Sequence, residues 1–267
     1  MRWFCILISA AALVVWTTAA HADFDVSPRW SGTPGDPIAT YGYDDTLAPA
    51  PAALSSNVIR VFEFDMNDPG PNTTTDPGFH ALSTDSGYTP SGLPDGSWLT
   101  FDVLSDLKYW NGSSFVAVPA NESLFFQLGS SFVTVGTGTG PYPLAGFLIG
   151  KVGPPAQTSE GLHVHLSTSI VGPGDTDPTN GIYMVEMDLR LLSSDQSTPY
   201  PGVSTSLPFW AIFDHDLNDP NDRVDAAVAY QNSLVPEPSS CVLAGLGGLV
   251  LAGRYLRRRF SVEMKSV

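Results

Sequence analysis

Hydrophobic residues recur at every second position in short runs between Asp23 and Val235, and clusters of Gly, Pro, Asn and Asp separate these runs. A period of two is typical of a β-strand with one buried face. Helical periodicity is scarce over the same stretch. The pattern therefore predicts an all-β domain, an antiparallel β-sandwich similar to a jelly roll. The expected strands lie at 58–64, 98–104, 114–118, 123–128, 131–135, 145–152, 162–171, 182–192 and 208–213.

Turn chemistry refines this prediction at three places. Asn111-Gly112, between two hydrophobic runs, predicts a tight β-hairpin. The proline-rich segment that follows Asp23 predicts an extended edge or a loop. The segments FEFDMNDP (62–69) and FDHDLNDP (213–220) are similar, so we expect two strands that leave the sheet through the same kind of acidic turn.

The amino-terminal end breaks the alternation. Arg2 is followed by an almost wholly apolar run from Trp3 to Trp16, and Ala20-His21-Ala22 offers two small residues around a cleavage point. This order is typical of a secretory signal peptide, and the run is shorter than the roughly 20 residues of a membrane span. We therefore predict a signal peptide at 1–22, removed by signal peptidase.

The carboxyl-terminal end breaks the alternation as well. Residues 241–256 are apolar apart from glycines and Arg254, and the cluster Arg257, Arg258 and Arg259 follows. At about 1.5 Å per residue this run makes a short transmembrane helix. The basic cluster favours a cytoplasmic location for the tail at 261–267. We expect the body at 23–235 to lie on the other side of the inner membrane, which holds the chain transiently.

The tripeptide Pro236-Glu237-Pro238, followed by the apolar run and by Arg257, Arg258 and Arg259, resembles the PEP-CTERM sorting signal of Gram-negative bacteria. The resemblance covers 235–260, and we take 236–260 as the sorting segment. It implies that a membrane-embedded exosortase recognises the Pro-Glu-Pro motif and that the helix is then removed. It also implies delivery to the cell surface or extracellular matrix. A plain single-span anchor is the alternative.

The net charge and the positions of the cysteines exclude several kinds of ligand and metal site. The chain has 12 Lys and Arg against 27 Asp and Glu, a net charge of −15, and the body is more acidic still because the arginine cluster lies in the tail. Such a charge repels nucleic acid and anionic lipid, and it suits cations, neutral exopolysaccharide or solubility in a matrix. Cys5 and Cys241 both lie outside 23–235, so we expect neither a disulfide nor a thiolate metal site in the body.

His163 and His165 are the first candidate metal ligands. They alternate with Leu162, Val164 and Leu166, so an extended strand directs both imidazoles to one face. Such a pair can hold zinc or copper, with His215, Asp214 and Asp216 as possible further ligands. A solvent-facing pair without a metal is the alternative. The His-x-His strand followed by Gly181 and Tyr183 is also similar to a pattern in bacterial surface-anchored domains, some of them linked to zinc homeostasis.

A second candidate is an oxygen-rich loop for calcium. Asp214, Asp216, Asn218 and Asp225 occupy positions 1, 3, 5 and 12 of a calcium-loop spacing. Position 6 is Asp219 instead of Gly, and we expect no flanking helices, so an EF-hand is not predicted. A looser calcium site in a β-loop and an Asx-rich turn remain the alternatives.

Motifs for nucleophilic catalysis are absent from the sequence, and we expect no enzyme. The sequence as a whole predicts an exported PEP-CTERM surface or extracellular-matrix protein with a structural or binding role. The alternatives are a surface metal-binding protein, for zinc, copper or calcium, and a carbohydrate-binding module.

Overall fold

The computed structural model describes residues 25–44, 55, 57–67, 69–83, 91–138, 147–153, 161–215 and 222–235. The predicted signal peptide at 1–22, the sorting segment at 236–260 and the tail at 261–267 lie outside these ranges. Within them, no helix is long and apolar enough to cross a membrane.

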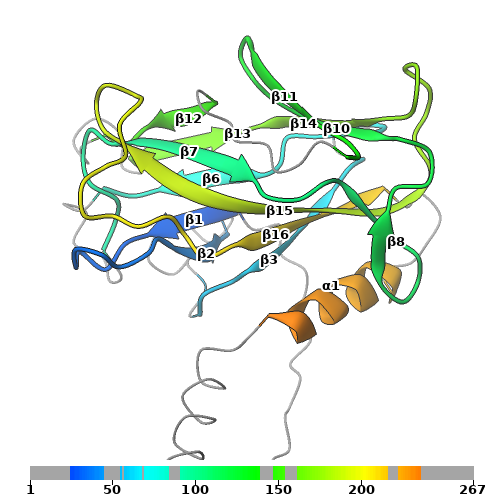
Figure 1. Cartoon of the computed structure of the whole chain (residues 1–267), viewed down its shortest axis with the longest axis horizontal. Coiled ribbons are helices and arrows are strands. Elements are labelled where there is room, and N and C mark those ends of the chain that lie inside the picture. Colours follow the sequence, from blue (N-terminus) through cyan, green and yellow to red (C-terminus); the bar gives the residue numbers. More distant parts are fainter. Residues whose placement is uncertain are drawn as a thin grey trace, which may run out of the picture.

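The described residues form three sheets and one helix, α1 (Asp222–Leu234) (Figure 1). The four-stranded sheet has the order β13 (Leu162–His165), β6 (Gly78–Ala81), β1 (Asp25–Arg29) and β2 (Ala39–Tyr43). The five-stranded sheet has the order β11 (Ser131–Val135), β10 (Ser123–Leu128), β14 (Ser167–Val171), β5 (Thr73–Thr74) and β4 (Pro69–Gly70). The seven-stranded sheet contains β12 (Leu148–Lys151), β7 (Trp98–Val103), β15 (Gly181–Leu192), β16 (Phe209–His215) and β3 (Val61–Asp65), with β8 (Lys108–Trp110) paired to β15 and β9 (Phe115–Ala117) paired to β8.

All three sheets contribute to one hydrophobic core. Phe79 of β6 stacks on Phe101 of β7 with ring centroids 6.2 Å apart, and Phe126 of β10 lies 6.0 Å from Phe213 of β16. The alternate residues of each strand fill this core because successive side chains of a strand point to opposite faces. The all-β prediction is confirmed, and each expected run overlaps an observed strand.

The hairpin prediction is also confirmed. β8 and β9 pair antiparallel on either side of Asn111-Gly112, and Gly112 has a φ of 96°, which favours glycine. The Asn111 side chain accepts hydrogen bonds from the backbone N–H groups of Ser113 and Ser114, at 3.0 Å each, and so closes the turn.

Two strand pairs are parallel, which the antiparallel prediction did not include. β1 pairs with β6 in parallel at Val26 and Phe79, and β16 pairs with β3 in parallel over five residue pairs. β1 is therefore an interior strand, so the prediction of an edge or loop was wrong at Pro28, whereas Pro34 and Pro37 lie in the irregular segment between β1 and β2, as predicted. Pro28 lies beyond the single register pair with β6, where its missing N–H removes no bond between these two strands.

The two similar acidic segments belong to these neighbouring parallel strands. β3 and β16 lie side by side with Phe64 opposite Phe213 and Asp65 opposite Asp214. Both strands therefore end on the same side of the seven-stranded sheet, whereas residues 216–221 of the second turn lie outside the described residues, so the expected likeness of the two turns stays a prediction. In the first turn, Asp65 accepts a hydrogen bond from the backbone N–H of Asn67 at 2.8 Å.

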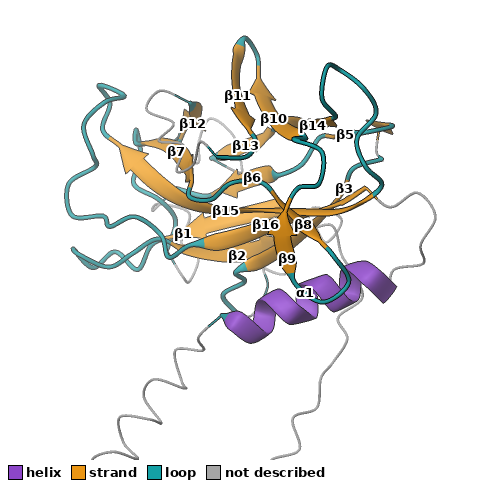
Figure 2. Cartoon of the chain, turned by 45° about the vertical axis from the view of Figure 1, so that its right-hand side comes forward, coloured by secondary structure: helices purple, strands orange, loops and turns teal. Residues whose placement is uncertain are grey.

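Helix α1 is the main departure from the predicted all-strand body (Figure 2). Val224 and Ala227 pack against Ile182 and Ile212, on the face of the seven-stranded sheet opposite the main core. Most apolar positions of the helix stand in one unbroken run at 226–230, which passes around the helix axis, so its sequence gives little helical periodicity. Tertiary packing overrides the weak local pattern here.

Candidate metal centre

The centre is built on β6, which lies between β13 and β1. His163 of β13 stands opposite His80, and His165 stands opposite Gly78. On the other side of β6, Val26 of β1 stands opposite Phe79. This register brings Asp25, at the start of β1, across Gly78 to the two histidines of β13.

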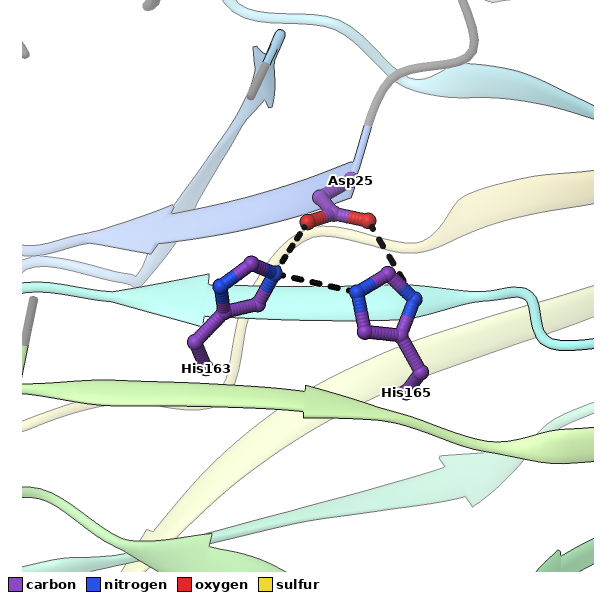
Figure 3. Close-up of side chains that lie close together, drawn as sticks. All are labelled: Asp25, His163 and His165. Carbon is purple, nitrogen blue, oxygen red and sulfur yellow. Dashed lines mark hydrogen bonds and ion pairs between the residues drawn. The ribbon is translucent and has the colours of Figure 1, made fainter. Parts of the chain in front are cut away.

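Three side-chain donors converge at this point (Figure 3). His163 Nε2 lies 3.0 Å from Asp25 Oδ2 and 3.0 Å from His165 Nε2. His165 Nδ1 lies 3.9 Å from Asp25 Oδ1. Ligands at about 2.0–2.1 Å from a tetrahedral zinc ion stand about 3.3 Å from one another, so this spacing suits a divalent transition metal. Asp25 is buried, whereas the side chains of His163 and His165 are 27% and 40% exposed, so the centre opens to solvent.

Glycine at position 78 makes the convergence possible. A Cβ atom on residue 78 would lie 1.8 Å from Asp25 Oδ1 and 2.9 Å from His165 Cε1. Any larger residue would therefore push the carboxylate and the imidazole apart. The space that a side chain of residue 78 in β6 would fill is taken by Asp25 of β1 and His165 of β13.

Asp76 supports the same centre from the turn before β6. Its Oδ1 accepts a hydrogen bond from the backbone N–H of Gly78 at 3.2 Å and lies 3.8 Å from His165 Nδ1. Its backbone N–H donates to Thr74 Oγ1 at 3.2 Å, and the residue is buried. Asp76 thus places a second carboxylate beside the ring nitrogen of His165 that faces away from His163.

The electrostatics of the centre favour a bound cation. Burial raises the pKa of the Asp25 carboxyl to about 6, against the opposing effect of His165 and His163, and Asp76 adds to the rise. A buried carboxylate is stabilised when a positive charge lies beside it. A metal ion held between Asp25 and the two imidazoles would supply that charge.

His80 lies beneath the centre but outside the group of converging donors. Its ring stacks on Tyr43 with centroids 3.5 Å apart and meets the His163 ring edge-on at 5.5 Å. Burial lowers the pKa of His80 to about 3, and the charge of Arg29 lowers it further. His80 is therefore neutral, and it serves as a platform for the His163 ring.

The structure brings together His163 and His165, as predicted, but their partner is Asp25. His215 is buried at the end of β16, where its Nε2 hydrogen-bonds Asn72 Oδ1, and it is not part of the only ligand group that the described residues contain. In the described residues, Asp25 takes the place that was considered for His215 as the further ligand. Asp25 stands 138 positions before His163, so no local spacing could reveal it.

The calcium-loop residues are placed only in part. Asp214 lies in β16 opposite Asp65, and Asp225 is exposed in α1. The expectation that no helix adjoins this loop was wrong, because α1 begins at Asp222 and contains the twelfth position. Asp216 and Asn218 lie outside the described residues, so the calcium site stays a prediction.

Comparison with known proteins identifies the end of the chain. Residues 234–259 match the PEP-CTERM protein-sorting motif, and the match begins at Leu234, where α1 ends. No curated protein and no solved structure shows a significant match, so the similarity to His-x-His surface domains has no support. The motif includes Pro236, Glu237, Pro238 and the arginine cluster. The chain carries the sorting signal of an exported protein that an exosortase directs to the cell surface.

Proposed function

We propose that this surface-sorted protein binds one divalent transition metal, preferably zinc, through Asp25, His163 and His165. The observation that supports the proposal is the convergence of three donor side chains from two strands over a glycine that leaves them room. In this proposal the body is a non-catalytic binding or structural component at the cell surface or in the extracellular matrix.

The donor set favours zinc or copper over calcium. Two of the three donors are imidazole nitrogens, which zinc and copper accept readily. Calcium takes six to eight oxygen ligands, so a single carboxylate with two imidazoles suits it poorly. Zinc bound by three protein ligands keeps one position for water or an external ligand, and the exposed side of the two histidines leaves that position accessible.

Calorimetric titration of the purified, metal-free protein with zinc, copper and calcium tests the proposal. We expect about one equivalent of zinc or copper to bind, and we expect His163→Ala/His165→Ala to abolish that binding. Asp225→Asn is the control, because it removes an oxygen donor of the calcium loop and leaves the centre intact. Zinc binding of equal stoichiometry in the double variant would show that the centre is not the site.

A further inference from the structure

Strand β11 forms a free edge of the five-stranded sheet. It pairs with β10 on one side, and no described strand pairs with its other side. In both Figure 1 and Figure 2 the hairpin of β10 and β11 projects from the body. Phe132, in β11, is 70% exposed, the highest value among the exposed large hydrophobic residues that the structure describes.

The geometry of the hairpin shows which backbone groups face outward. Gly129 has a φ of 59° in a two-residue turn, and Leu128 stands opposite Ser131. The residues that flank a two-residue turn exchange backbone hydrogen bonds, and this pairing alternates along an antiparallel ladder. Phe132 and Thr134 therefore direct their N–H and C=O groups away from β10, toward the free edge.

This edge lies in an uncharged part of a strongly acidic protein. The net charge of the chain is −15, yet no charged residue or histidine occurs between Glu122 and Lys151. Exposed edge strands usually carry charges or proline, which discourage pairing with another chain. β11 has neither, and its sequence SFVTV is rich in residues that favour strands.

The other described edges are protected. β12 carries Lys151, and β3 carries Glu63 and Asp65. The outer side of β2 is covered, because Ser55 and Ile59 donate backbone hydrogen bonds to it at 2.8 Å each. β13, the other outer strand of the four-stranded sheet, is four residues long and carries His163 and His165, and β4 and β9 are only two and three residues long. β11 is thus the described edge best suited to strand addition.

We propose that β11 is a self-association surface that pairs antiparallel with β11 of a second copy of this chain. Two identical strands can satisfy each other across a two-fold axis, and the pairing joins the two five-stranded sheets into one. The net charge of −15 on each copy opposes association, and this uncharged edge is where two copies approach with the least repulsion. The proposal is independent of metal binding, since it uses neither the centre nor its ligands.

Sedimentation velocity of the purified protein over a wide concentration series tests the proposal. EDTA is present, so that association through a shared metal does not contribute. We expect the weight-average sedimentation coefficient to rise with concentration. We expect Phe132→Glu/Thr134→Glu to weaken self-association roughly tenfold or more, because like charges then face each other across the pair.

Two further variants make the result specific. Leu207→Glu is the matched control, because Leu207 is also exposed, at 52%, and lies outside β11; it should associate like the natural protein. Thr134→Pro removes one outward N–H without a negative charge and should also prevent association. Circular dichroism checks that each variant is folded. A natural protein that stays monomeric throughout, or folded β11 variants that associate as it does, would overturn the proposal.

Discussion

Gly78 stands between the strand that carries the two histidines and the strand that carries Asp25. Gly78→Ala places a methyl group 1.8 Å from Asp25 Oδ1, so the carboxylate must move. We expect zinc affinity to fall at least about tenfold and the free energy of unfolding to fall by about 1–3 kcal/mol, the usual cost of overpacking. Zinc titration and urea unfolding measure the two effects. Gly70→Ala is the control, because its added Cβ would lie at an ordinary 3.5 Å from Thr73 Oγ1; an unchanged zinc affinity in folded Gly78→Ala would contradict the proposed centre.

Asp76 is placed to act on a metal bound at the proposed centre through His165. A metal-bound histidine commonly donates its other ring N–H to a carboxylate, and Asp76 Oδ1 lies 3.8 Å from His165 Nδ1. Asp76→Asn keeps an acceptor for the Gly78 N–H but loses the negative charge. We expect roughly tenfold weaker zinc binding, with the ¹⁵N shifts of His165 reporting a changed tautomer balance. Tight binding with an unaltered His165 spectrum would remove Asp76 from this role.

The sequence revealed this centre only in part. Alternation along one strand was enough to put His163 and His165 on one face, because i and i+2 side chains share a face in any extended chain. Asp25 could not be found in this way, because its position depends on the order of β13, β6 and β1 in the sheet. His215 was considered as a ligand because the body has few histidines, but it lies on β16 in the seven-stranded sheet, whereas His163 and His165 lie on β13 in the four-stranded sheet.

At the scale of elements, the paired strands β7 and β15 bring two acids together. Asp188 stands directly opposite Asp102, which accepts a hydrogen bond from Arg190 Nη2 at 2.8 Å. Burial raises the pKa of Asp188 to about 6, and the charge of Asp102 adds to the rise, while Arg190 opposes it. The folded state therefore holds this proton more tightly than the unfolded chain does.

This raised pKa predicts a pH dependence of stability. Protonated Asp188 adds to the free energy of unfolding, and this contribution is fully present below the ordinary pKa of 3.8. It is lost as the pH rises to about 6, because the folded state then carries a poorly solvated charge. We expect Asp188→Asn to melt at a higher temperature than the natural protein at pH 7 and to show a flatter stability profile between pH 4 and 6. Thermal melts across that range measure both effects. The exposed Asp177→Asn should match the natural protein, and equal slopes for Asp188→Asn and the natural protein would contradict the assignment.

Helix α1 holds to the sheet through a small apolar contact. Val224→Ala removes buried methyl groups that pack in the cluster with Ile182 and Ile212. We expect a loss of about 1–2 kcal/mol in the free energy of unfolding, measured by denaturant titration. Val116→Ala, at an exposed position of β9, should have little effect. An unaffected Val224→Ala protein would mean that α1 contributes little to the stability of the fold.

The strands were predictable and the helix was not, because an element can be predicted only where its buried residues recur with a clear period. Strand β15 alternates buried and half-buried residues over 185–191, so its pattern is visible in the sequence. Helix α1 buries only Val224 and Ala227 in the cluster on one sheet face, and its consecutive apolar residues at 226–230 leave no clear period. The parallel pairing of β1 with β6 and of β16 with β3 was equally hidden, because strand order depends on contacts between distant segments.

At the scale of the whole molecule, the folded body leads directly into the sorting signal. The PEP-CTERM motif begins at Leu234, the last residue of α1, so little chain separates the folded body from the sequence that the exosortase must reach. The metal centre lies on β1 and β13, whereas the motif follows α1 on the seven-stranded sheet. Sorting and the proposed metal binding therefore use different elements of the protein and should be separable by mutation.

Replacement of Pro236, Glu237 and Pro238 by alanine in an exosortase-containing host tests this separation. We expect the variant to accumulate in the inner-membrane fraction, because the motif is lost while the apolar segment and arginine cluster remain. The retained protein should still bind zinc with the stoichiometry of the natural protein, since Asp25, His163 and His165 are unchanged. Glu263→Ala, an acid-to-alanine change beyond the motif, should reach the surface normally. Surface delivery of the triple variant at the natural level would show that the Pro-Glu-Pro motif does not control sorting, and loss of zinc from it would show that the two functions are coupled.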